Sequence, residues 1–192
     1  MTAGVLGVLV SGSGTNLQAL IDDGLPVAGV ASNVAGVRAL ERADTAAIPS
    51  AVFELTDYGG REERDLAMAD WLSGLGVDLV VCAGYMQLLT PGFLARFPGR
   101  VVNVHPSLLP AFPGTHAVAD ALAAGASETG VTVHYVDEGV DTGPVIVQER
   151  VRIGPEDTPD SLLERLHAVE HRLLPRVVRQ LMSAGRPVGG AR

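Results

Sequence analysis

An amide and an imidazole stand two residues apart in the segment Asn103-Val-His105-Pro. The apolar run 101–104 predicts a buried strand, and alternate side chains of a strand project to the same side. Asn103 and His105 should therefore point together at the carboxyl end of that strand, where open α/β sheets bind ligands. An amide can donate to an oxyanion and an imidazole can carry a proton. A lone histidine is more often structural, but the neighbouring asparagine and the proline-rich loop 105–114 favour catalysis.

A glycine-rich turn, residues 11–16 (Ser-Gly-Ser-Gly-Thr-Asn), follows the apolar run 5–10 and precedes an amphipathic stretch. A helix that begins after such a turn directs free N–H groups and a partial positive charge at a ligand, and phosphate suits both. The alternative is that Thr15 or Asn16 only caps the helix. A dinucleotide fingerprint fails because Leu17 replaces the third glycine and no acid stands at 31–33. No Gly-Lys-Ser/Thr sequence marks a P-loop.

Four carboxylates occur between Glu128 and Asp141, on an acidic turn between two predicted strands. Most of them should simply be solvated. Asp141 differs because it precedes Thr-Gly-Pro and should lie at the tight end of the turn, where a carboxylate could orient the imidazole and stabilise its charged form. Taken alone, Glu170 would be an ordinary surface carboxylate.

The elements that must position these residues follow from periodicity and from glycine and proline positions. We expect strands at 5–10, 27–31, 51–55, 77–83 and 101–104, and helices at 17–22, 37–47, 61–75, 91–97, 116–124 and 162–182. Alternating residues at 130–136 and 145–151 predict an antiparallel pair. This order predicts an α/β fold: a doubly wound, mostly parallel, Rossmann-like sheet flanked by helices, with an antiparallel edge. We expect one catalytic domain over 1–184 and a loose tail at 185–192.

The composition limits which binding partners and which cellular compartment we expect for this chain. The net charge is −8 and every basic residue is arginine, so we expect no nucleic acid partner. No signal peptide or apolar stretch of membrane-spanning length is apparent, so we expect no membrane. The single cysteine, Cys82, lies in an apolar run and should be buried and unreactive, which fits the cytoplasm. No residues stand at metal-ligand spacing, and we expect no metal.

The glycine turn, the segment from Asn103 to Pro110 and the Asp141-Thr-Gly-Pro segment closely resemble the phosphoribosylglycinamide formyltransferase family. The resemblance runs from residue 5 to about residue 181. It implies transfer of the formyl group of 10-formyltetrahydrofolate, a co-substrate, to the amine of glycinamide ribonucleotide in purine biosynthesis. The amine would attack directly, and Asn103 and His105 would stabilise a tetrahedral intermediate with help from Asp141.

The resemblance also implies two binding sites. The ribonucleotide would contact Gly14, Thr15, Asn16, Pro106, His167 and Glu170, with Glu170 at the substrate amine. The folate would contact Arg61, Met86, Gln87, Leu88, Leu89, Asn103, Asp137, Glu138, Gly139, Val140 and Asp141. Gln87 stands where many relatives carry arginine, which removes a charged contact to the folate tail. No role is assigned to His116, His134 or His171.

Three alternatives share part of this pattern. A formyltetrahydrofolate hydrolase would use the same amide, imidazole and carboxylate with water as acceptor, but usually carries an extra N-terminal domain. A methionyl-tRNA formyltransferase would add an RNA-binding domain and basic charge. A non-catalytic nucleotide-binding module would not need Asn103, His105 and Asp141 together. The partners expected are small molecules, and the chain could be a monomer or a homodimer.

Overall fold

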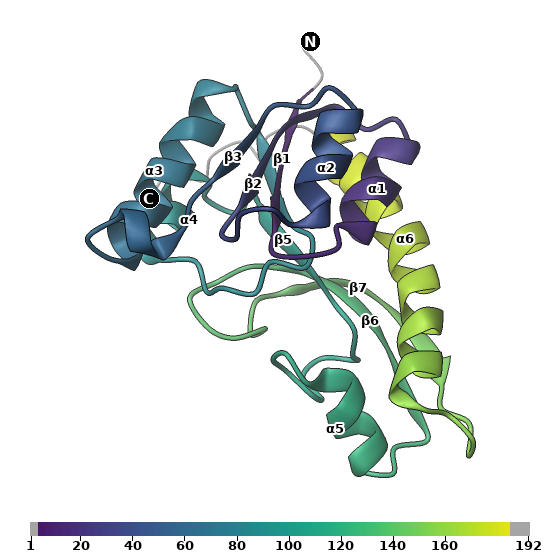
Figure 1. Ribbon diagram of the computed structural model, residues 1–192. Helices are drawn as coiled ribbons and strands as arrows, with labels where there is room; N and C mark the ends of the chain where they lie inside the picture. Colours follow the sequence, from purple (N-terminus) through teal and green to yellow (C-terminus); the bar gives the residue numbers. More distant parts are fainter. Residues whose placement is uncertain (1–3, 185–192) are drawn as a thin grey trace.

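A seven-stranded sheet forms the centre of the molecule (Figure 1). The structure, a computed structural model, describes residues 4–184, so the tail predicted at 185–192 lies outside the described residues. The strands are β1 (Leu6–Val10), β2 (Val27–Ser32), β3 (Ser50–Val52), β4 (Leu79–Cys82), β5 (Val101–His105), β6 (Glu128–Tyr135) and β7 (Val145–Arg152). The helices are α1 (Thr15–Asp22), α2 (Arg38–Thr45), α3 (Arg61–Gly74), α4 (Pro91–Arg96), α5 (Ala117–Ala123), α6 (Pro159–Ser183) and the short 3₁₀ helix η1 (Leu55–Asp57).

The strand order is β3-β2-β1-β4-β5-β6-β7. Strands β1 to β5 pair in parallel, whereas β6 and β7 are antiparallel to their neighbours. The predicted fold class is thereby confirmed. The strand order reverses between β1 and β4, and doubly wound sheets open a crevice at the carboxyl ends of the strands at such a point.

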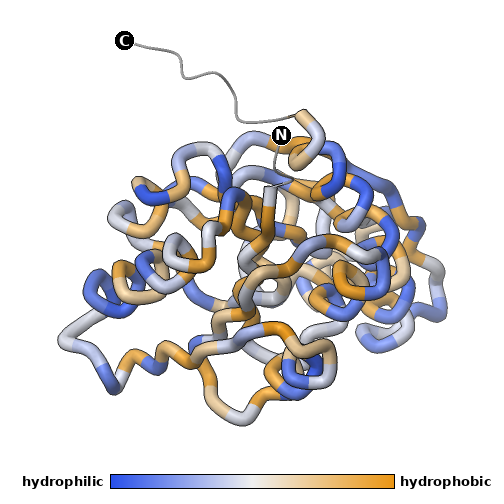
Figure 2. The backbone as a smooth tube through the Cα atoms, turned by 90° about the horizontal axis from the view of Figure 1, so that it is seen from above, coloured by the Kyte–Doolittle hydropathy of each residue, from blue (hydrophilic) through white to orange (hydrophobic). Residues whose placement is uncertain are grey.

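Alternate side chains of each buried strand point to opposite faces of the sheet, so a separate hydrophobic core lies on each face. On β1, Leu6, Val8 and Val10 pack with residues of α1, α2 and α6, while Leu9 packs on the other face with residues of α3 and α4. Figure 2 shows hydrophobic stretches through the central strands and mixed polar and apolar residues along the outer helices. Two covered faces hold the central strands rigid, so their carboxyl ends are fixed points for a site. No helix in the described range 4–184 is long and apolar enough to cross a membrane.

Most elements differ from their predicted bounds by one or two residues at an end, and two of them differ by three. The strand expected at 51–55 ends at Val52 and leads into η1, because it is an exposed edge strand with little to pack against. Helix α6 begins before the expected residue 162. Thr158 and Ser161 form a capping box that satisfies the first N–H groups, and Pro159 occupies the first helical position, which proline favours.

Candidate active site

Two cavities meet at the carboxyl ends of β1, β4 and β5. The first, which we call the apolar cavity, has a volume of about 290 Å³ and is lined by Cys82, Gly84, Tyr85, Met86, Gln87, Leu88, Leu89, Asn103, Val104, His105, Pro106, Gly114, Thr115, His134, Val136, Asp137, Gly139, Val140 and Asp141. The second, the glycine-turn cleft, has a volume of about 450 Å³, and its lining includes residues 11–16, Pro106, His167 and Glu170. Both are bordered by Gly84, Met86, Val104, Pro106 and Thr115, so a molecule in one can reach a molecule in the other.

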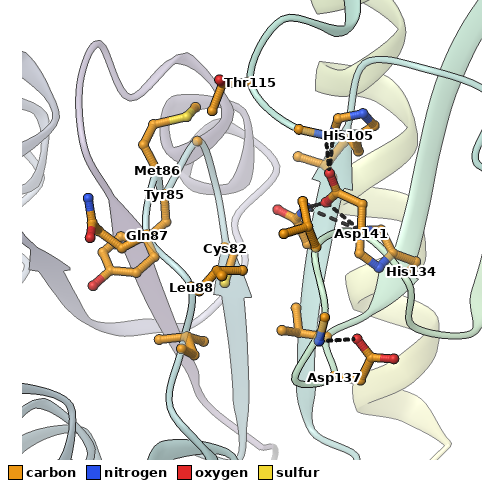
Figure 3. Close-up of a pocket in the computed structure, with 18 of the residues that line it drawn as sticks. Cys82, Tyr85, Met86, Gln87, Leu88, His105, Thr115, His134, Asp137 and Asp141 are labelled. Carbon is orange, nitrogen blue, oxygen red and sulfur yellow. Dashed lines mark hydrogen bonds and ion pairs between the residues drawn. The ribbon is translucent and has the colours of Figure 1, made fainter. Parts of the chain in front are cut away.

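The apolar cavity has one apolar wall and one polar wall (Figure 3). Met86, Tyr85, Gln87 and Leu88 from the loop after β4 form the first wall, and His105, His134 and Asp141 face it from β5, β6 and the turn after β6. Such a cavity suits a flat, largely apolar ligand with its reactive group toward the polar wall.

Asp141 is the centre of the polar wall. Its Oδ2 lies 3.4 Å from His105 Nδ1 and accepts from the Gly114 N–H at 2.8 Å, and its Oδ1 lies 3.5 Å from His134 Nε2. Burial alone would raise the pKa of Asp141, but the contact with His134, the hydrogen bond from the Gly114 N–H and the charge of His105 together lower it to about 2. The carboxylate is therefore ionised at neutral pH, in a left-handed backbone conformation (φ 53°) that aspartate tolerates.

Both ring nitrogens of His105 face hydrogen-bond acceptors. Nδ1 faces the Asp141 carboxylate, and Nε2 donates to the Phe112 carbonyl at 2.9 Å. Phe112 has a φ of 53°, rare for an aromatic residue, and this conformation accompanies the contact of its carbonyl with the ring. The arrangement accommodates a proton on each nitrogen, as a group that stabilises a developing negative charge requires.

Asn103 lies beside this pair and contacts both His134 and Asp141. Its Nδ2 is 3.1 Å from His134 Nε2 and donates to Asp141 Oδ1 at 3.3 Å. Asn103 and His105 on one segment and Asp141 on another, all singled out from the sequence, thus come together in one cluster.

The glycine-rich turn after β1 forms the end of the glycine-turn cleft. Gly14 is the N-cap of α1, with a φ of 69°, and a Cβ there would lie 2.6 Å from Ala39 Cβ, so only glycine fits. No side chain caps α1, so its first N–H groups are available to an anion. Ser11 fixes the turn, because its Oγ donates to Asn33 Oδ1 and accepts from the Met86 N–H of the loop after β4.

Glu170 on α6 is buried within the glycine-turn cleft and accepts a hydrogen bond from Asn16 Nδ2 at 2.9 Å. Burial raises the pKa of Glu170 to about 7, although the Asn16 hydrogen bond acts in the opposite direction. Asn16 Oδ1 is buried and has no hydrogen-bond partner within the described chain. The two side chains therefore present acceptors to a ligand with N–H groups.

The raised pKa of Glu170 predicts a pH-dependent stability. Below its ordinary pKa of 4.5 the carboxyl is protonated in the folded and unfolded states, whereas above 7 the folded protein must bury a charge. Glu170→Gln removes that cost, so its stability relative to wild type should rise by about 3 kcal/mol between pH 4.5 and pH 8. Urea unfolding at both pH values measures this, with the exposed Glu164→Gln as matched control. A difference from wild type that is the same at both pH values would contradict the burial of an ionisable Glu170.

The remaining residues assigned by resemblance lie near the cavities with two exceptions. Arg61 does not line the apolar cavity, but its Nη2 donates to the Leu88 carbonyl at 2.7 Å and so contacts the loop that does. Glu138 is exposed and outside the lining, although Asp137 and Gly139 on either side belong to it. Cys82 is buried at the cavity floor, and burial raises the pKa of its thiol to about 12, which makes it a poor nucleophile.

Two residues of this site received no role from the sequence. His134 stands directly opposite Asn103 in the β5–β6 ladder, a register that no single-sequence pattern reveals. Its only signal was its position in an alternating strand. Ser11 links two loops that are 75 residues apart, and its signal was its place at the start of the glycine turn.

A doubly wound sheet with an anion-binding turn after its first strand and an amide–imidazole–carboxylate cluster at its carboxyl edge defines a class of group-transfer enzymes. The family model described as formyl transferase matches residues 6–178, and the chain belongs to that family. A relative in Mycobacterium tuberculosis (strain H37Rv) named phosphoribosylglycinamide formyltransferase is 45% identical over 187 residues, which cover 95% of this chain and 87% of the relative.

Solved structures and longer relatives agree with that assignment. This chain is also similar to a solved structure, the crystal structure of glycinamide ribonucleotide transformylase 1 from Symbiobacterium toebii. The two superpose with a TM-score of 0.94 at 42% sequence identity, and the match covers 99% of this chain and 93% of the solved one. A trifunctional purine biosynthetic protein from Chironomus tentans is 47% identical over 186 residues, which are 93% of this chain but 14% of that protein. The chain therefore corresponds to one segment of such multifunctional relatives.

Proposed function

We propose that this chain transfers the formyl group of 10-formyltetrahydrofolate to the amine of glycinamide ribonucleotide, as a step of purine biosynthesis. One observation carries the proposal: the apolar cavity and the glycine-turn cleft share a border at Pro106 and Val104, next to Asn103 and His105. A flat folate in the first cavity and a phosphorylated amine in the second would meet at this cluster. The names of the relatives support formyl transfer to this acceptor.

The chemistry follows from the groups at that border. The amine attacks the formyl carbon and a tetrahedral oxyanion forms; the bond from carbon to the folate N10 then breaks. The attacking nitrogen loses one proton and N10 gains one, so the reaction balances without an external acid. His105 donates to the oxyanion and relays the proton, and Asn103 donates through its amide. Asp141 holds His105 and stabilises its charge.

The two substrates would be bound by different interactions. The folate ring system would lie against the apolar wall, where Met86 and Leu88 are exposed, and its polar edge would meet backbone groups of the loop after β4. The ribonucleotide phosphate would accept from the free N–H groups at the start of α1, and its amine would meet Glu170 and Asn16 Oδ1.

Removal of the phosphate from the acceptor should lower kcat/KM strongly, because binding energy at the remote phosphate orients the amine. Thr15→Pro should reproduce part of this loss as a higher KM for the ribonucleotide, since proline removes one N–H but is tolerated at the first helical position. Thr15→Ala keeps that N–H and should raise KM less. Steady-state kinetics on both acceptors measure this, and equal kcat/KM with and without phosphate would place the anion elsewhere.

The proposal as a whole is tested by the absorbance change of folate deformylation with and without the ribonucleotide. We expect turnover only when the ribonucleotide is present. An equal rate without it would make water the acceptor and the chain a hydrolase.

A further inference from the structure

His134 is a buried histidine on the polar wall that the mechanism above does not use. It pairs directly with Asn103 across the antiparallel β5–β6 ladder, so the two side chains project from the same face of the sheet. Its side chain is 3% exposed, and each of its ring nitrogens has a polar neighbour.

The hydrogen position on the His134 ring follows from its contacts. Nδ1 lies 2.8 Å from the Tyr135 carbonyl oxygen, which can only accept, so Nδ1 carries a proton. In the neutral ring, Nε2 then has a lone pair and can only accept.

That lone pair decides which way the Asn103 amide points. Nδ2 of Asn103 lies 3.1 Å from His134 Nε2 and 3.3 Å from Asp141 Oδ1, so each amide hydrogen meets an acceptor. In the reversed amide, the carbonyl oxygen would face a lone pair and a carboxylate, with no hydrogen for either. With a neutral His134 ring, the contacts therefore allow one orientation of the amide.

We propose that His134 is a positioning residue that holds the Asn103 amide in its donor orientation for the formyl oxygen; this inference rests on the proposed function. The Asn103 amide hydrogen that His134 Nε2 accepts anchors the amide. The other Asn103 amide hydrogen, which Asp141 Oδ1 accepts, makes the longer contact and is the one that turns to the oxyanion as it forms. Without the anchor, the amide can reverse and present its oxygen to a developing negative charge.

The test compares two substitutions of His134. His134→Leu removes the acceptor and should lower kcat about tenfold, the effect of one neutral hydrogen bond, with KM for both substrates unchanged. His134→Gln offers Oε1 as an acceptor and should recover most of the loss. In the Asn103→Ala background, His134→Leu should cost nothing further, because no amide is left to orient. A loss of the same size in that background, or a rise in KM with normal kcat, would overturn the positioning role.

A second measurement does not depend on activity. The ¹⁵N chemical shifts of the His134 ring in the wild-type protein should show a protonated Nδ1 and a bare Nε2 at neutral pH. A bare Nδ1, or a proton on Nε2, would overturn the inference even if both variants were impaired. Failure of the wild type to transfer a formyl group to the ribonucleotide would instead overturn the proposed function, and the ring shifts would still decide the orientation of the amide.

Discussion

Replacement of His105 by alanine is expected to lower kcat by ~10²–10⁴, the usual effect of losing one acid–base group. The imidazole is buried beside Asp141 and lies between Val104 and Pro106, which border both cavities, so it is the group best placed to move a proton. Folate affinity should stay near normal, because the apolar wall of the cavity, formed by the loop after β4, is unchanged.

His105→Gln serves as the matched variant for that experiment. Glutamine can still donate to the Phe112 carbonyl and support the loop, but it cannot relay a proton. We therefore expect kcat of His105→Gln to stay low while its thermal stability returns toward wild type. Turnover by either variant close to the wild-type rate would show that His105 does not act in the reaction.

Asn103→Ala is expected to reduce kcat by ~10²–10³, the typical cost of removing one donor to an oxyanion. Alanine removes the amide hydrogens that face His134 and Asp141 in the substrate-free protein. The loss should appear equally in kcat and kcat/KM, because the interaction forms only in the transition state.

Steady-state kinetics with each substrate varied in turn decide between two roles for Asn103. A rise in KM at constant kcat would make it a binding residue that contributes equally to ground state and transition state. Circular dichroism and folate titration of the same variant exclude a general loss of structure.

Much of this molecule could be predicted from its sequence because the signals are local. The apolar runs of β1 and β4, the glycine turn and the proline-rich loop each mark their structure within a few residues. Asn103 and His105 share a strand, so their side-chain direction follows from the period of two. The α/β fold then places the carboxyl ends of β1, β4 and β5 together without further information.

The remainder depends on contacts between distant segments. The roles of His134 and Ser11 require the strand register and the loop packing, which alternation alone does not give. Helix α3 illustrates the same limit. Its charged residues Arg64 and Asp65 are both buried as an ion pair, and Asp65 also accepts from the Thr90 N–H. A charged pair is stable in a core only when the two side chains contact each other, and the sequence alone does not show that contact.

The most direct test of the account follows the formyl carbon itself. With ¹³C in the formyl group of 10-formyltetrahydrofolate, NMR of the reaction mixture distinguishes a formylated amine from free formate. We predict that the label appears in the formamide of the ribonucleotide, one for each folate consumed, and that no label moves when the ribonucleotide is omitted. Label released as formate at the same rate with and without the ribonucleotide would contradict transfer to the amine as the function of this site.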